Sequence, residues 1–218
     1  MMITVSAFKW VPDFAQGLVR DLRVRWALEE AGWPYEVLLI ESADQGTDSY
    51  RALQPFGQVP AYRENGFVMF ESAAIVLHIA ERSDALMPGD AAAQALTKTW
   101  LFAAINTMEP AFDGLADLDL FHAGEDWVAQ RRPAAEAHVK TRLAELAAVL
   151  AGKDYLVGGR FTAADLLMAT VLRNLRHTTL VADEPVLDAY LKRCQARPAF
   201  RKALADQLAT FEQNAPAA

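Results

Sequence analysis

The chain has 218 residues, of which 53% are hydrophobic and 22% are charged, as expected for a globular protein of one large domain or two compact ones. Its net charge of -7 argues against nucleic acid or an anionic membrane surface as the main partner, so an anionic ligand must be held locally. The single cysteine, Cys194, excludes an internal disulfide, a dithiol redox centre and a Cys-based zinc site.

The first residues, 1–5, lack the basic region and the long apolar run of a signal peptide. No uninterrupted apolar stretch is long enough to span a bilayer. We therefore expect a cytoplasmic protein with no membrane partner. Nothing in the sequence predicts a bound metal, and thiol chemistry requires a thiol that a ligand brings.

The first forty residues predict a strand, a helix and a second strand. Residues 3–8 and 35–40 are β-branched and apolar, and apolar residues recur at helical spacing from Leu18 until Gly32 ends the helix. A short return between the two strands predicts that they are parallel. Four charged residues are expected on the outer face of this helix: Arg23, Arg25, Glu29 and Glu30.

A short helix over 49–53 and a β-hairpin follow. The strands 60–63 and 67–70 flank Asn65-Gly66, which is the strongest short-range signal for a hairpin turn. A helix over 72–82 then packs against the sheet. Residues 1–83 are therefore expected to form one α/β domain, and 84–90, with Pro88 and Gly89, a linker.

The remaining residues, 91–218, are predicted to be all-helical. Residues 161–176 are apolar on nearly every side, as is typical of a buried central helix. Thr162 and Asp165 at its start resemble a capping box, and we assign them to structure.

The most informative stretch for function is Gly57-Gln58-Val59-Pro60. Proline restrains Val59 to extended geometry, so its N–H and C=O can pair with an extended peptide. Ser72 can cap a helix whose first N–H groups favour a carboxylate, and Glu71 suits an ammonium group. Taken singly, these residues equally describe a turn before a strand and a plain helix cap. Together they predict a site for a small zwitterionic peptide.

In four segments the chain resembles the cytosolic glutathione transferases, of the bacterial type. The segments are LRVRWALEEAGWPYE (22–36), QPFGQVP (54–60), FESAAI (70–75) and FTAAD (161–165). The resemblance implies a thioredoxin-like N-terminal domain, an all-α C-terminal bundle that supplies the acceptor pocket and dimer contacts, and a homodimer.

The resemblance also assigns roles to the peptide site. The Val59-Pro60 bond is expected to be cis, with Val59 pairing with the cysteinyl backbone of glutathione. Glu71 and Ser72 are expected to hold the γ-glutamyl end, with Gln58 beside them. Glutathione is then a co-substrate, and its thiolate reacts with a small hydrophobic electrophile by conjugation, peroxide reduction or glutathione-assisted isomerisation, a role in detoxification.

The sequence departs from the family where a hydroxyl or thiol usually activates the sulfur. Residues 10–22 contain no Tyr, Ser, Thr or Cys. The remaining donors are Lys9, Trp10, Gln16, Arg20 and the backbone N–H groups near Gly17 and Leu18. Arg20 is the best side-chain candidate for a catalytic role, because a permanent cation lowers the pKa of a nearby thiol; Trp10 is the second. For the glycyl carboxylate, Arg51 and Lys9 are alternatives.

The acceptor site is expected on the first helix of the second domain, where Trp100, Phe102, Asn106 and Phe121 lie on or after the helix. An aromatic stripe at helical spacing is also compatible with a core. The leading interpretation is a glutathione transferase. The alternative is a non-catalytic glutathione- or ligand-binding protein of the same fold, and a third is a purely structural dimerisation module without glutathione affinity.

Overall fold

The computed structural model describes residues 2–216, which divide into two compact units. One unit contains the chain up to Met87 together with the segment from Ala196 onward, and the other is Pro88–Gln195. The first break falls inside the segment 84–90 that was expected to be a linker. The last helix differs from the expected division, because it groups with the first unit rather than with the other helices.

The first unit is built on a four-stranded sheet with the order β2-β1-β3-β4. Its strands are β1 (Ile3–Phe8), β2 (Glu36–Ile40), β3 (Ala61–Glu64) and β4 (Phe67–Phe70). β1 and β2 are parallel, whereas β3 is antiparallel to β1 and to β4. Asn65 and Gly66 both have positive φ, at 50° and 88°, as a tight hairpin turn requires. This is the predicted thioredoxin-like arrangement.

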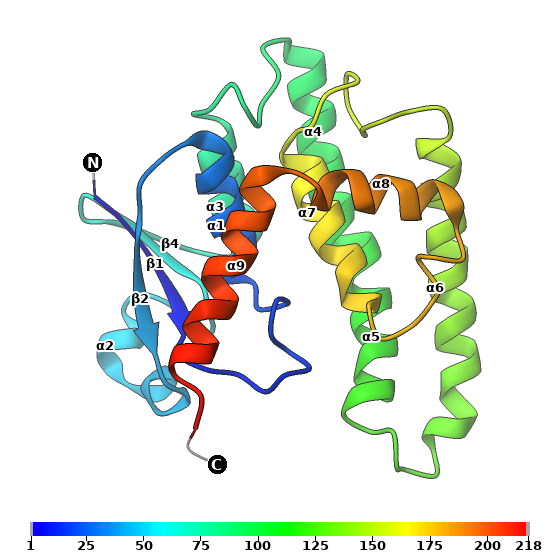
Figure 1. Cartoon of the computed structure of the whole chain (residues 1–218), viewed down its shortest axis with the longest axis horizontal. Coiled ribbons are helices and arrows are strands. Elements are labelled where there is room, and N and C mark those ends of the chain that lie inside the picture. Colours follow the sequence, from blue (N-terminus) through cyan, green and yellow to red (C-terminus); the bar gives the residue numbers. More distant parts are fainter. Residues whose placement is uncertain (1, 217–218) are drawn as a thin grey trace. The chain divides into compact units, whose positions relative to one another are not determined.

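Four helices accompany this sheet: α1 (Asp21–Ala31), α2 (Asp48–Arg51), α3 (Ser72–Ala80) and α9 (Pro198–Gln213). α1 and α3 cover one face of the sheet, and α2 lies on the other side (Figure 1). α1 begins at Asp21, three residues after the expected start at Leu18. The reason is local, since the Leu18 N–H donates to the Ala15 carbonyl in a turn. Gly32 ends the helix in the left-handed conformation, as predicted.

The expectation that Arg23 and Arg25 lie on an outer face of α1 is wrong. Their exposed fractions are 4% and 2%, because α3 and α9 both pack against this helix (Figure 1). Arg25 Nε donates to the buried Asp21 carboxylate at 2.7 Å, and Arg23 donates to the Ser72 hydroxyl at 3.3 Å. Burial of such cations requires partners of this kind.

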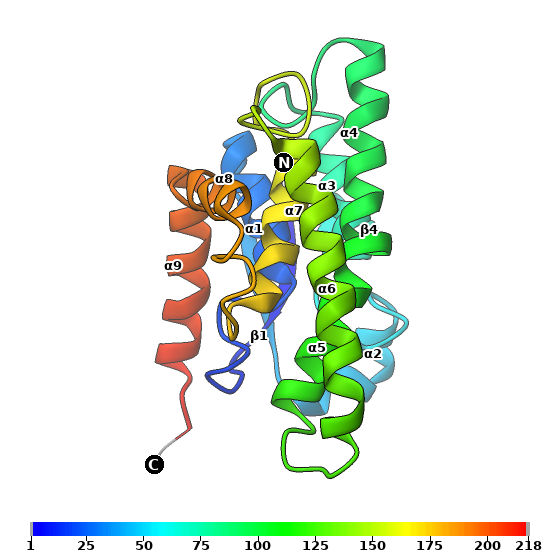
Figure 2. The same cartoon turned by 90° about the vertical axis from the view of Figure 1, so that its right-hand side faces the viewer.

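The second unit is entirely helical. Its helices are α4 (Ala91–Ala103), α5 (Glu109–Leu120), α6 (Val128–Leu150), α7 (Ala163–Leu172) and α8 (Pro185–Gln195). A π-helical turn, Ala104–Met108, joins α4 to α5. Figure 2 shows α4, α5 and α6 running alongside the yellow α7.

α7 is the predicted central helix, since every one of its residues is buried. Its capping box is also confirmed: Asp165 Oδ2 accepts from the N–H and the hydroxyl of Thr162, at 2.9 and 3.1 Å. The other oxygen of Asp165 accepts from the Leu156 N–H and the Tyr190 hydroxyl. Asp165 thereby ties three segments of this unit together, as the structural assignment expected.

Within residues 2–216, no helix combines the length and the apolar composition that crossing a membrane demands. The same residues contain no group of three or more His, Cys, Asp or Glu side chains arranged to hold a metal ion.

Candidate functional site

The turn before β3 presents an unpaired backbone edge. The Val59-Pro60 bond is cis, as the resemblance implied. The Val59 side chain is buried against Ile40 and Tyr50. Among the described residues, none forms a hydrogen bond with the N–H or C=O of Val59. Two adjacent backbone groups that lack partners are what an extended peptide needs in order to dock.

A relay of three hydrogen bonds fixes both sides of this turn. The Ala61 N–H donates to Ser6 Oγ at 2.7 Å, and the Tyr50 hydroxyl donates to the Gln58 carbonyl at 2.7 Å. The 2.8 Å contact between the two hydroxyls must therefore be donated by Ser6. Burial raises the pKa of Tyr50, which keeps its hydroxyl protonated and able to donate. The relay joins β1, α2 and the residues on either side of Val59 and Pro60.

Gly57 is required by the same turn. Its φ is +68°, and an added Cβ would lie 2.5 Å from the Gln45 carbonyl oxygen. Gln45 in turn donates from its side chain to the Gly57 carbonyl at 2.6 Å. Only glycine fits a left-handed conformation this close to another backbone. The Gln58 side chain, which follows, is exposed.

The start of α3 supplies donors and one free acid beside this turn. The sequence suggested Ser72 as the helix cap, but Glu71 occupies the cap position and Ser72 is the first helical residue. Glu71 has a φ of 69° and is exposed with no ion-pair partner among the described residues. The first N–H groups of α3 have no intrahelical acceptors, so they and the helix dipole favour an anion there.

Ser72 is buried and accepts a hydrogen bond from Arg23, whose guanidinium lies beneath the helix start. Because the Ser72 oxygen accepts from Arg23, its own proton is available to a ligand acceptor. A buried cation next to a helix N-terminus strengthens the preference for a carboxylate. Sequence reasoning missed Arg23, since the sequence placed it on the charged outer face of α1 and gave no sign that it contacts Ser72.

The segment before α1 contains the expected activating residues, and several of them already have partners within the chain. Lys9 is paired with Glu41 at 2.6 Å, and the Gln16 amide donates to Val11 and Asp13 within its own loop. The Leu18 N–H donates to Ala15. Arg20 is exposed and occupies the cap position of α1, and Trp10 is half-buried two residues after the end of β1.

The expected acceptor residues belong to the second unit. Asn106 lies on the π-helical turn, and such turns are frequent at functional sites. Trp100 is half-buried on α4, while Phe102 and Phe121 are 50% and 62% exposed. Phe102 and Phe121 are therefore not core residues of this unit. Cys194, by contrast, is fully buried in α8, so its thiol lies away from the surface.

Two residues of the relay, Ser6 and Tyr50, were also not singled out from the sequence. Ser6 interrupts an otherwise apolar strand, β1, and Tyr50 lies in a helix of four residues. A buried strand with one hydroxyl is a weak signal, because it identifies a buried donor but not its partner.

Comparison with known proteins places both parts of the chain in one family. Residues 22–86 match the family model of the glutathione S-transferase N-terminal domain, and residues 107–198 match that of the C-terminal domain. Glutathione S-transferase 3 of Zea mays is 31% identical over 207 residues, which cover 84% of this chain and 88% of that protein. A glutathione S-transferase of Hypomyces subiculosus is 29% identical over 206 residues, 84% of this chain and 93% of its own.

Solved structures agree with these matches. The crystal structure of a glutathione transferase from Burkholderia graminis, with two glutathione molecules bound per subunit, superposes with a TM-score of 0.80 at 27% identity. The match covers 93% of this chain and 87% of that one. A glutathione transferase from Populus trichocarpa has a TM-score of 0.81 at 22% identity, over 94% of this chain and 99% of its own.

Proposed function

Because this chain belongs to the glutathione S-transferase family, we propose that it binds glutathione in its first unit and transfers the glutathione sulfur to a small hydrophobic electrophile. The observation that carries this proposal is the unpaired backbone of Val59 beside the start of α3. One edge that pairs with a peptide lies next to one anion site and one unpaired acid, which together match the groups of a zwitterionic tripeptide.

In the proposed complex, the Val59 N–H and C=O pair with the cysteinyl residue of glutathione. The Ser72 hydroxyl and the first N–H groups of α3 bind the γ-glutamyl carboxylate, and Arg23 stabilises that charge from below. Glu71 pairs with the γ-glutamyl ammonium group. Gln58 contributes an exposed amide at the same edge, and Pro60 sets the geometry of the turn.

The chemical step starts from the thiolate of glutathione, which is the reactive form. The thiol proton leaves to solvent, and Arg20 stabilises the sulfur anion, with Trp10 lining the site. The sulfur lone pair then forms the bond to the electrophile. In substitution the leaving group departs with its electron pair, whereas in conjugate addition the carbanion takes a proton from water.

The second unit is proposed to hold the electrophile, through Trp100, Asn106 and Phe121. Aromatic side chains that are half-buried or exposed, together with an amide, suit an apolar acceptor with one polar group. We further propose that the protein acts as a cytoplasmic homodimer in detoxification.

A titration with glutathione tests the proposal. Calorimetry reports affinity, and the ultraviolet absorbance of bound thiolate reports activation. Glu71→Gln removes the charge that pairs with the ammonium group and is expected to weaken binding about tenfold. The matched control is Glu212→Gln, an exposed acid on α9, which leaves affinity unchanged.

Arg20→Ala tests activation separately from binding. We expect it to keep affinity and to lose most of the thiolate absorbance at neutral pH, whereas Arg201→Ala, an exposed arginine on α9, keeps both. Wild-type protein that does not bind glutathione would refute the proposal. Binding without any thiolate signal in the wild type would instead favour the alternative, a non-catalytic binding protein. The absence of a hydroxyl or thiol side chain in residues 10–22 is the sequence feature that supports this alternative.

A further inference from the structure

The apolar stripe by which α9 packs on α1 contains a glutamine. The buried residues of α9 are Phe200, Ala203, Gln207 and Phe211, whose spacings of three and four place them on one face of the helix. This face packs against α1, where the Phe200 ring lies edge-on to that of Trp26 with their centroids 4.7 Å apart. Gln207 is fully buried, so its amide has given up its hydrogen bonds to water and requires partners within the protein.

The Gln207 amide finds those partners at the start of α1. Its Nε2 atom, which carries two protons, donates to Asp21 Oδ1 at 2.7 Å and to the Val19 carbonyl at 3.2 Å. Asp21 is the first residue of α1 and is fully buried. Val19 and Asp21 flank Arg20, the residue that we proposed above as the activator of the thiol. One side chain from the last helix therefore holds the residues on both sides of Arg20.

Packing alone does not account for a glutamine at this position. The Oε1 atom of Gln207 is buried without a hydrogen-bond partner among the described residues, and an apolar side chain of the same size would avoid this unpaired oxygen. The donors of the amide have a clear purpose, however. Burial raises the pKa of Asp21, an effect that the charge of Arg25 and the hydrogen bonds from Arg25 and Gln207 oppose. Gln207 thus favours an ionised carboxylate in the first turn of α1, where the helix dipole also favours it.

Val19 also contacts the turn that is proposed to hold glutathione. Its side chain packs against the buried cluster that contains Val59, and Val59 is the residue proposed to pair with the cysteinyl part of glutathione. The Val19 carbonyl accepts from the Leu22 N–H at 3.0 Å as well as from Gln207. The backbone directly before Arg20 is therefore fixed by α1, by α9 and by the cluster beneath the glutathione turn.

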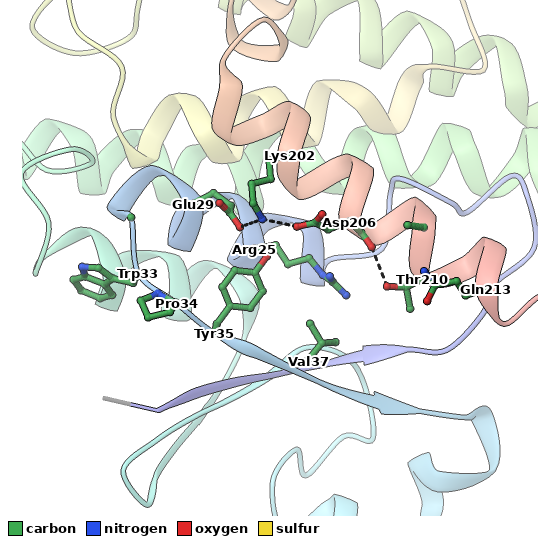
Figure 3. A pocket seen from close by; sticks show the side chains of 12 residues that line it. Arg25, Glu29, Trp33, Pro34, Tyr35, Val37, Lys202, Asp206, Thr210 and Gln213 are labelled. Atoms are coloured by element: carbon green, nitrogen blue, oxygen red, sulfur yellow. Dashed lines mark hydrogen bonds and ion pairs between the residues drawn. The ribbon is translucent and has the colours of Figure 1, made fainter.

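A separate set of contacts joins the same two helices around the pocket drawn in Figure 3. Lys202 on α9 donates to Glu29 on α1 at 2.8 Å and to Asp206 at 2.7 Å. The Lys202 side chain is 57% exposed, and Glu29 lies about two turns after Asp21 along α1. The contact between α1 and α9 can therefore be weakened there without removing the hydrogen bonds of Gln207.

We propose that Gln207 is a positioning residue for activation of the glutathione thiol. This inference rests on the proposed function, in which Arg20 is the group that stabilises the thiolate. By holding Val19 and Asp21, Gln207 fixes the backbone of Arg20 beside the glutathione turn and keeps the guanidinium charge close to the sulfur. Because the interaction between two charges weakens with distance, a start of α1 that is free to move lowers the fraction of thiolate.

The test follows the ultraviolet absorbance of bound thiolate against pH, in the full chain at saturating glutathione. Gln207→Met keeps the size of the side chain and removes both donors. We expect it to raise the apparent pKa of the bound thiol by about 0.5–1, less than the rise of about 1–3 expected when Arg20→Ala removes the nearby cation. Calorimetry is expected to give a glutathione affinity near the wild-type value, because the hydrogen bonds of Gln207 go to Val19 and Asp21 and not to the residues that hold the peptide.

The double variant Arg20→Ala/Gln207→Met distinguishes positioning from a general structural effect. Because Gln207 acts through Arg20, the double variant is expected to have the same thiol pKa as Arg20→Ala alone. Gln207→Asn, whose amide is one methylene shorter, is a milder change that does not depend on Gln207→Met folding. It is expected to shift the thiol pKa in the same direction.

Two controls weaken the contact between α1 and α9 at other places. Phe200→Leu removes part of a ring from the same buried stripe and is expected to lower Tm about as much as Gln207→Met. Lys202→Met removes the ion pairs shown in Figure 3. Both controls are expected to keep the thiol pKa of the wild type.

Three results would overturn the inference. The first is an unchanged thiol pKa in both Gln207→Met and Gln207→Asn. The second is a control that shifts the thiol pKa as much as Gln207→Met, and the third is an equal effect of Gln207→Met with and without Arg20. In each case the wild type still binds glutathione and forms the thiolate, so the proposed function stands. A wild type without a thiolate signal would instead refute the thiol activation on which the inference rests.

Discussion

Tyr50→Phe removes one oxygen atom from the relay that fixes the turn around Val59. Without it, the Gln58 carbonyl loses its donor at 2.7 Å and the Ser6 hydroxyl loses its acceptor at 2.8 Å. A lost hydrogen bond with buried partners costs about 1–3 kcal/mol. For a chain of this length, 1 kcal/mol lowers Tm by about 2–4 °C. We therefore expect Tm to fall by several degrees.

The relay also predicts an effect on glutathione, because it holds the residues on both sides of Val59. With Gln58 released, part of the binding free energy must be used to order the turn again. We expect the glutathione affinity of Tyr50→Phe, measured by calorimetry, to fall about three- to tenfold. Ser6→Ala interrupts the same relay, so the double variant should be little worse than either single one.

The matched control is Tyr62→Phe. Tyr62 is a fully buried tyrosine on β3 whose hydroxyl donates to Glu64 at 3.0 Å, so the same atom is removed from the same unit at a distance from the turn. We expect a comparable fall in Tm with unchanged glutathione affinity. If the two variants lose stability alike and neither changes affinity, the relay is a structural feature only and the reasoning is refuted.

Three further changes test other parts of the structure. Gly57→Ala should lower both Tm and glutathione affinity, because its Cβ would lie 2.5 Å from the Gln45 carbonyl oxygen. Its control is Gly66→Ala, because Gly66 also has a positive φ but no atom within 4 Å of an added Cβ. This control should lose only about 1–2 kcal/mol of stability through left-handed backbone strain and keep its glutathione affinity. Asp165→Asn should lower Tm by several degrees, because four hydrogen bonds to a buried carboxylate are weakened; exposed Asp126→Asn is its control. The hydrogen bond from Arg82 lowers the pKa of Glu64 to about 2, so its stabilising contribution, about 3 kcal/mol, is complete above pH 4.5 and disappears as pH falls toward 2. Glu64→Gln should therefore flatten the dependence of Tm on pH across that window, and an unchanged slope would contradict the assigned pKa.

The parts of the fold that follow from short-range rules were predictable. Asn65-Gly66 specifies the hairpin, and Thr162 with Asp165 specifies the start of α7, since each signal acts within a few residues. The edge at Val59 was predictable for the same reason, because a proline restricts its neighbour.

The parts that depend on distant segments were not predictable. Arg23 and Arg25 resemble surface residues of an amphipathic helix until α3 and α9 cover them. α9 itself carries an ordinary amphipathic pattern, which does not say that α1 is its partner. Ser72 was expected to cap α3, but the positive φ of Glu71 moves the cap one residue earlier.

Contacts within the chain also determine which groups of the segment before α1 are available to activate the thiol of glutathione. Before the structure, the segment 9–20 offered four side-chain donors and two backbone groups. Lys9 is now paired with Glu41, and Gln16 and the Leu18 N–H are used inside the loop itself. Arg20, exposed at the start of α1, carries a permanent charge that acts on a nearby sulfur through space and does not require a vacant hydrogen bond. Activation by the charge of Arg20, as we propose, predicts a thiolate signal that weakens as ionic strength rises.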